Sequence, residues 1–129
     1  MIKGFMTGSF DIIHRGHIEI IKYGRSMCDY FIIAIDEDDR IKSKKGNSRP
    51  FNNLEDRMEV LSSIRYVDKV VSFKDEVDLE NILNLERPEW WLMGSDWKDK
   101  PRPEINSFCK NIFFNRIGDY STTKILKEE

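Results

Sequence analysis

The 129-residue sequence is poor in several features, and each shortage excludes a class of protein. It has only two cysteines, Cys28 and Cys109, which lie far apart and lack the CxxC spacing of redox and zinc sites. No apolar run approaches the length that spans a bilayer, and the N-terminal residues show no signal peptide. We therefore expect a soluble, cytoplasmic protein, not associated with a membrane, whose thiols are reduced and partly buried.

An excess of charge of one sign is also lacking. Lysine and arginine number 21 and aspartate and glutamate 23, which gives a net charge of −2. A general nucleic-acid binder carries an excess of basic charge, so we expect no nucleic-acid partner. A small phosphorylated ligand is compatible with this balance, because a few basic side chains can gather locally. The length predicts a single domain over residues 1–129.

Hydrophobic runs of strand length alternate with segments of helical period. The expected strands lie at residues 2–7, 30–35, 67–71, 90–93 and 112–114. The expected helices lie at residues 18–27, 54–61 and 79–83, with a last helix from residue 122 onward. The stretches 36–52 and 96–103 are expected to be irregular. This alternation predicts the α/β class: a single-domain, Rossmann-like, doubly wound parallel five-stranded sheet with helices on both faces.

The most informative segment is Gly8–His17, which reads GSFDIIHRGH and joins the first expected strand to the first expected helix. It contains both histidines of the chain, His14 and His17. Backbone N–H groups at a helix N-terminus favour an anion, and Gly16 would let a phosphate approach the backbone closely. Alternatively, both histidines are surface or core residues without a ligand. A zinc site is a second alternative, but no cysteine or third histidine completes its coordination shell. The sequence contains neither GxxxxGK[ST] nor GxGxxG, which argues against a P-loop ATPase and a dinucleotide oxidoreductase.

This segment resembles the G-[TC]-F-D-x-x-H-x-G-H signature of the cytidylyltransferase-like nucleotidyltransferases. Further matches follow in order: IRYVD at 64–68 resembles the R-Y-V-D segment of the family, MGSDW at 93–97 its M-G-D-D-W segment, and YSTTKI at 120–125 its I-S-T-T-K-I segment. The four blocks span nearly the whole chain. The resemblance implies an enzyme that transfers a nucleotidyl group from a nucleoside triphosphate to a small phosphorylated molecule and releases pyrophosphate.

The resemblance also implies roles for individual residues. The implied catalytic residues, which contact phosphate, are His14, His17, Lys44 and Arg116. The implied nucleotide-binding residues are Ser9, Phe10, Gly16, Gly94, Ser95, Asp96, Ser121, Thr122 and Thr123. The implied acceptor-binding residues are Asp11 and Arg65. Mg²⁺ is expected to enter with the triphosphate, whose oxygens hold it in the main, and not at a metal site of the protein.

Several of these residues have a structural alternative. The sequence does not distinguish which of Lys42, Lys44 and Lys45 reaches a phosphate, and the lysine run is also compatible with a solvated loop. Arg65 is equally compatible with a surface ion pair to a nearby aspartate or glutamate. Ser121 is also a suitable N-cap for the last helix. Trp90 and Trp91 should point to opposite faces of a strand, into the core or an interface.

Two branches of the family match different segments of the chain. RYVD and MGSDW resemble glycerol-3-phosphate cytidylyltransferase, whereas KGNSRP at 45–50 and GDYSTT at 118–123 resemble the adenylyltransferase of ADP-heptose synthesis. We expect transfer of CMP from CTP to glycerol 3-phosphate or a similar acceptor. The alternatives are adenylyl transfer from ATP to a sugar phosphate of the heptose-1-phosphate type, and a non-catalytic nucleotide-binding module. The resemblance also suggests a homodimer.

Overall fold

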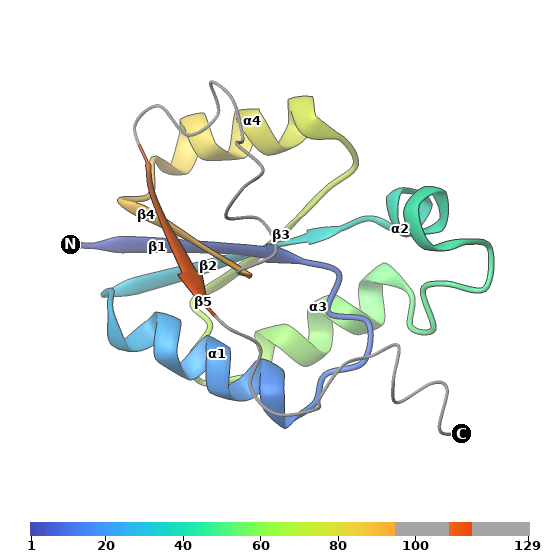
Figure 1. The fold of residues 1–129 in the computed structure, drawn as a ribbon, viewed down its shortest axis with the longest axis horizontal. Helices are drawn as coiled ribbons and strands as arrows, with labels where there is room; N and C mark the ends of the chain where they lie inside the picture. Colours follow the sequence, from blue (N-terminus) through green and yellow to red (C-terminus); the bar gives the residue numbers. More distant parts are fainter. Residues whose placement is uncertain (95–108, 115–129) are drawn as a thin grey trace.

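The computed structural model describes residues 1–94 and 109–114, which form a parallel sheet with its helices. The strands are β1 (Lys3–Gly8), β2 (Tyr30–Asp36), β3 (Lys69–Phe73), β4 (Trp90–Gly94) and β5 (Lys110–Phe114). The helices are α1 (Arg15–Ser26), α2 (Asp38–Lys45), α3 (Leu54–Ser62) and α4 (Glu76–Glu86). In Figure 1, α1 and α3 cover one face of the sheet and α4 covers the other. The predicted five-stranded α/β sheet is thereby confirmed.

The strands are buried on both faces, as their continuous apolar runs predict. In β2, residues 31–35 are all inaccessible to solvent. Phe31, Ile33 and Ile35 face the layer of α1 and α3, whereas Ile32 and Ala34 pack with Leu79 and Leu83 of α4. This alternation follows from the two-residue period of a strand, so the sheet has an apolar core on each side.

The strand order places β1 at the centre of the sheet. From β1 the chain adds β2 and then β3 on one side, and it crosses to the other side with β4 and β5, so the order is β3-β2-β1-β4-β5. In open α/β sheets the ligand crevice lies outside the carboxyl ends of the strands, at the point where the strand order reverses. Here that point lies between β1 and β4, where Gly8 and Gly94 end their strands.

The stretch 36–52 is not irregular throughout, as the sequence had led us to expect, because it contains α2. This helix buries only one side chain, that of Ile41, so it has no apolar stripe for the sequence to reveal. Its charges favour a helix instead: Asp38 and Asp39 lie in the first turn, and lysines lie in the last turn. The helix ends at Gly46, whose φ of +100° suits glycine. The helix expected from residue 122 onward lies outside the described residues.

The tryptophans and cysteines are where the sequence predicts them. Trp90 packs on the side of α1 and Trp91 on the side of α4, so both belong to the core. Both cysteines are free thiols, and burial raises their pKa, to about 12 for Cys109. Within residues 1–94 and 109–114 there is no helix with the length and apolar character needed to cross a membrane.

Gly4 of β1 should not tolerate a side chain. A Cβ atom there would overlap the indole of Trp90, whereas among the described residues the nearest atom to a Cβ at Gly94 belongs to Phe114, at 3.9 Å. We expect Gly4→Ala to lower the free energy of unfolding by about 1–3 kcal/mol, the usual cost of overpacking. The matched variant Gly94→Ala should lower it by less than about 1 kcal/mol. Urea unfolding followed by circular dichroism compares the two, and equal losses would contradict the steric argument.

Candidate active site

The candidate site begins where the chain leaves β1 and turns toward α1. Phe10 has a φ of +48°, a conformation that is rare for a bulky residue. Its ring turns back into the core, where only 4% of the residue is exposed, and packs beneath Gly8. This packing holds the unusual backbone in place. The turn therefore leaves the backbone of Ser9 and Phe10, rather than the phenyl ring, at the edge of the sheet.

The two histidines form a reciprocal cap at the start of α1. His14 is the N-cap, and its Nδ1 accepts a hydrogen bond from the Gly16 N–H at 3.1 Å. His17 is the third helical residue, and its Nδ1 accepts a hydrogen bond from the His14 N–H at 3.2 Å. This is the geometry of a capping box, with histidines in place of serine and glutamate, and it explains the three-residue spacing. The rings lie 3.9 Å apart between centroids.

These hydrogen bonds determine where each ring carries its proton. A neutral imidazole that accepts at Nδ1 carries its proton on Nε2, so each ring offers an Nε2–H as a donor. The pKa of His17 is lowered from 6.5 to about 4, first by burial and then by the Coulombic influence of His14 and Lys45, which disfavours a positive charge on this ring. His17 is therefore neutral at pH 7, and it can donate a hydrogen bond to a phosphate oxygen without being charged.

Of the three lysines in the run, Lys45 is the one that reaches the turn. Its Nζ donates to Ser9 Oγ at 3.1 Å, and burial followed by the charge of Arg49 lowers its pKa. Lys44, the residue chosen from the sequence, is exposed on α2, as Lys45 is, and Lys42 lines a pocket between α2 and the loop that follows it. The geometry therefore favours Lys45 over Lys44 for contact with a phosphate.

Asp11 is part of the internal structure of the turn. Its carboxylate is completely buried and accepts hydrogen bonds from Phe51 N at 2.7 Å, Asn52 N at 2.8 Å and Arg49 Nε at 3.1 Å. The expectation that Asp11 orients a hydroxyl of the acceptor does not fit this geometry, because its oxygens already accept three internal hydrogen bonds. Asp11 instead attaches the loop of residues 49–52 to the first turn.

Arg57 is a residue whose role the sequence reading missed. It is 1% exposed, and its Nη1 donates to the carbonyls of Ser9 at 2.9 Å and Asp36 at 2.7 Å. Nη2 forms an ion pair with Asp38 at 2.6 Å, and Nε donates to the Asn52 carbonyl. Arg57 thus joins the first turn, the end of β2 and the start of α3. The sequence does contain a signal for this buried role, because Arg57 lies on the apolar stripe of α3.

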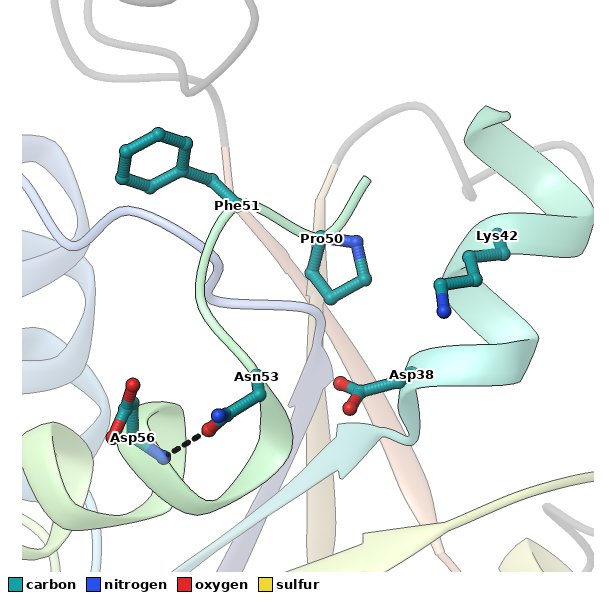
Figure 2. A pocket seen from close by; sticks show the side chains of 6 residues that line it. All are labelled: Asp38, Lys42, Pro50, Phe51, Asn53 and Asp56. Carbon is teal, nitrogen blue, oxygen red and sulfur yellow. Dashed lines mark hydrogen bonds between the residues drawn. The ribbon is translucent and has the colours of Figure 1, made fainter. Parts of the chain in front are cut away.

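A pocket of about 240 Å³ opens beside the turn, between α2 and the start of α3. Figure 2 shows side chains from both helices around it, with the loop that joins them. The lining residues are Asp38, Lys42, Pro50, Phe51, Asn53 and Asp56. The side chain of Asn53 caps α3 by accepting from Asp56 N at 2.9 Å, as the sequence predicts. Carboxylate, amide, ammonium and aromatic groups therefore share one open pocket.

The remaining predicted residues fall into three groups. Gly16 lies at the start of α1 and Gly94 at the carboxyl end of β4, so both share the sheet edge with Ser9. Arg65 lies past the end of α3, where β2 and β3 begin, so the structure separates it from the first turn. Its guanidinium donates a hydrogen bond to Tyr66 Oη at 2.7 Å. The predicted site residues outside the described residues are Ser95, Asp96, Arg116, Ser121, Thr122 and Thr123.

Comparison with known proteins identifies relatives over most of the chain. A sequence model of a family described as cytidylyltransferase-like matches residues 5–127. The chain is 38% identical over 125 residues to the "Bifunctional protein HldE" of Aliarcobacter butzleri, which covers 95% of this chain and 26% of the relative. It is 41% identical over 95 residues to that of Gluconacetobacter diazotrophicus, covering 74% and 19%. The chain thus spans about a fifth to a quarter of the length of the curated relatives it matches.

Solved structures share the fold. The lipopolysaccharide core biosynthesis protein from Thermoplasma volcanium superposes with a TM-score of 0.77 at 22% identity, covering 92% of this chain and 99% of that chain. The pantoate-beta-alanine ligase from Francisella tularensis superposes with a TM-score of 0.61 at 16% identity, covering 97% and 67%. Both likenesses confirm the Rossmann-like architecture.

His17 should make the protein less stable in acid. Because its pKa is lowered to about 4 in the folded protein, the unfolded chain takes up a proton first as the pH falls below 6.5. The stability contributed by the neutral ring is therefore present above pH 6.5 and is lost as the pH falls toward 4. We expect this group to reduce the free energy of unfolding by about 1–3 kcal/mol between neutral pH and the folded pKa.

Urea denaturation over this pH range measures the effect. His17→Gln removes the titrating group, while glutamine still accepts a hydrogen bond at the third position of a capping box. The variant should lose this part of the pH dependence, and identical pH profiles for the two proteins would contradict the lowered pKa.

Proposed function

Because the chain belongs to the cytidylyltransferase-like family of nucleotidyltransferases, we propose that it transfers the adenylyl group of ATP to a sugar phosphate and releases pyrophosphate. The first expectation, transfer from CTP to glycerol 3-phosphate, has less support than this alternative. The main observation is the 38% identity to an HldE protein over 95% of the chain. The KGNSRP and GDYSTT segments, which resemble the adenylyltransferase of ADP-heptose synthesis, point in the same direction.

The reaction needs positioning and charge stabilisation more than a protein nucleophile. An oxygen of the acceptor phosphate attacks the α-phosphorus in line, and a new P–O bond forms. The bond from the α-phosphorus to the oxygen that bridges to the β-phosphate breaks, and pyrophosphate leaves with that electron pair. The attacking phosphate oxygen is already ionised at neutral pH, so no general base is required. The protein has to hold both phosphates in line and to stabilise the developing negative charge.

The first turn has the groups for this task. We assign the Nε2–H donors of His14 and His17 to the α- and β-phosphates, where charge develops in the transition state. The positive end of the α1 helix dipole, at which both rings lie, favours the same anion. Lys45, beside Ser9, supplies a positive charge at the same edge. Both rings are held by the backbone at Nδ1, so the donors are oriented before the substrate arrives.

The residues outside the described part of the chain keep the roles that the resemblance implies. Arg116 and residues 121–123 are proposed for the β- and γ-phosphates, and Ser95 and Asp96 for the base and ribose. Mg²⁺ would enter with ATP and neutralise phosphate charge. The buried Asp11 carboxylate does not fit as a ligand for it, because three N–H donors occupy its oxygens. Within the described ranges no group of three or more metal-ligating side chains gathers.

Pyrophosphate release tests the proposal directly. The purified protein is incubated with Mg²⁺, one of ATP, CTP, GTP or UTP, and one acceptor from a panel of sugar phosphates, glycerol 3-phosphate and phosphorylated amino-alcohols. We expect the highest kcat/KM with ATP and a sugar 1-phosphate. Preference for CTP and glycerol 3-phosphate would support the cytidylyl alternative. Nucleotide binding without pyrophosphate release from any pair would indicate a non-catalytic module and overturn the enzyme assignment.

His17→Ala should slow the reaction strongly. The variant removes a donor aimed at the transition state, so we expect kcat to fall by about 100-fold or more. His17→Gln is the matched control, because it keeps the capping acceptor and also offers an amide N–H. It should retain more activity than alanine at equal folded fraction, which circular dichroism verifies. A kcat near that of the parent protein for His17→Ala would remove His17 from the mechanism.

A further inference from the structure

We propose that Arg49 binds the phosphate of the acceptor, and that the acceptor is a sugar phosphate whose hydroxyl groups lie in the pocket between α2 and α3. This inference rests on the proposed function, because it assigns the second substrate of the same reaction. It adds to that function a binding residue and an orientation for the acceptor.

The first argument is the guanidinium of Arg49, which is buried but incompletely bonded. Only 11% of its side chain is exposed. Nε donates to Asp11 Oδ2 at 3.1 Å, whereas the buried Nη2 has no hydrogen-bond partner in the described part of the chain. A charged donor left without an acceptor in a buried position is costly, and buried polar groups are rarely left in that state. A ligand oxygen at Nη2 would complete the bonding of Arg49.

The second argument concerns the charge that this ligand must carry. Arg49 and Lys45 lie close enough for the charge of Arg49 to lower the pKa of Lys45. Asp11 pairs with Arg49, and Lys45 adds a second positive charge beside Ser9, so the local charge favours an anion. A guanidinium fork with a second nitrogen available is well suited to phosphate oxygens. The ligand that fits Nη2 is therefore a phosphate group.

The third argument distinguishes the acceptor from the nucleotide. The crevice at the reversal of strand order lies between β1 and β4. Arg49 lies instead on the loop after α2, which follows β2, on the other side of the first turn. His14 and His17 lie at the start of α1, directly after the first turn, and thus between the side of β4 and the side of β2. An acceptor phosphate at Arg49 and a nucleotide on the side of β4 would then meet at the histidines, as an in-line attack requires.

The fourth argument is the chemistry of the neighbouring pocket. Pro50, the next residue after Arg49, lines it together with the carboxylates of Asp38 and Asp56. Carboxylate groups accept hydrogen bonds from sugar hydroxyls, and Lys42, which also lines the pocket, can donate hydrogen bonds to them. Phe51, which is 66% exposed, offers an apolar surface to a sugar ring. The phosphate should therefore lie at Arg49 and the hydroxyl groups in the pocket, whose volume of about 240 Å³ accommodates a monosaccharide.

Steady-state kinetics with separate variation of the two substrates tests the proposal. For Arg49→Ala we expect the KM of the sugar phosphate to rise about 10- to 100-fold, as for loss of a charged hydrogen bond. The KM of ATP should change less than about twofold. Arg49→Lys keeps the charge but not the fork, so it should regain only part of the affinity. Lys22→Ala, which removes one exposed positive charge from α1, is the charge-matched control and should leave both constants unchanged.

A second variant avoids any disturbance of Asp11. Asp56→Ala changes the pocket but not the bonds of Arg49, so it should raise the KM of a sugar 1-phosphate and not that of ATP. If the enzyme is active and Arg49→Ala changes the acceptor KM no more than Lys22→Ala does, Arg49 does not bind the acceptor. If glycerol 3-phosphate is preferred over every sugar phosphate, or if Asp56→Ala has no effect on the acceptor KM, the pocket does not bind a sugar.

Calorimetric titration without nucleotide separates failure of this inference from failure of the proposed function. The probes are α-D-mannose 1-phosphate and inorganic phosphate, and neither titration needs turnover. We expect both probes to bind, with Arg49→Ala weakening the binding of both and Asp56→Ala weakening the binding of the sugar phosphate alone. This result would support the subsite even if no pyrophosphate were released. No binding of either probe to the parent protein would overturn it.

Discussion

One buried guanidinium holds together the edge of the sheet on which the candidate site lies. Arg57 comes from α3, yet it bonds the carbonyls of Ser9 and Asp36, which lie where β1 and β2 leave the sheet. A carbonyl at such a position has no strand partner and needs another donor. The ion pair with Asp38 balances the charge of Arg57. Without Arg57, buried carbonyls and a carboxylate would lose their donors, and the first turn would lose its position relative to α2 and α3.

Asp11 complements Arg57 with the opposite charge. It reaches from the first turn to the loop of residues 49–52, and its carboxylate accepts two backbone N–H groups of that loop. The two residues thus hold the same loop to the same turn through independent contacts. The loop carries Arg49 and one wall of the pocket, and α2 just before it carries Lys45. The site is therefore formed by two segments far apart in sequence, with buried charges at the junction.

Local patterns in the sequence were sufficient for much of this structure. The run at 30–35 reveals a strand buried on both faces, and the spacing of His14 and His17 reveals a helix start. The contacts that assemble the site are not local, since Arg57 and Ser9 are 48 residues apart. Choosing between Lys44 and Lys45 requires knowing which face of α2 each residue occupies. Because α2 has no apolar stripe, the sequence does not reveal this. The separation of Arg65 from the first turn depends on where α3 ends relative to the sheet.

The histidine cap has a consequence for conformational entropy. A flexible side chain that becomes ordered on binding a ligand costs about 0.5–1.5 kcal/mol of affinity. His14 and His17 have already lost this freedom, because their Nδ1 atoms accept hydrogen bonds from backbone N–H groups at the start of α1. Their ordering is thus part of the cooperative folding of the domain, so its entropy cost is not subtracted from the affinity for a phosphate. In the proposed function, phosphate recognition by these two rings would be a by-product of helix initiation.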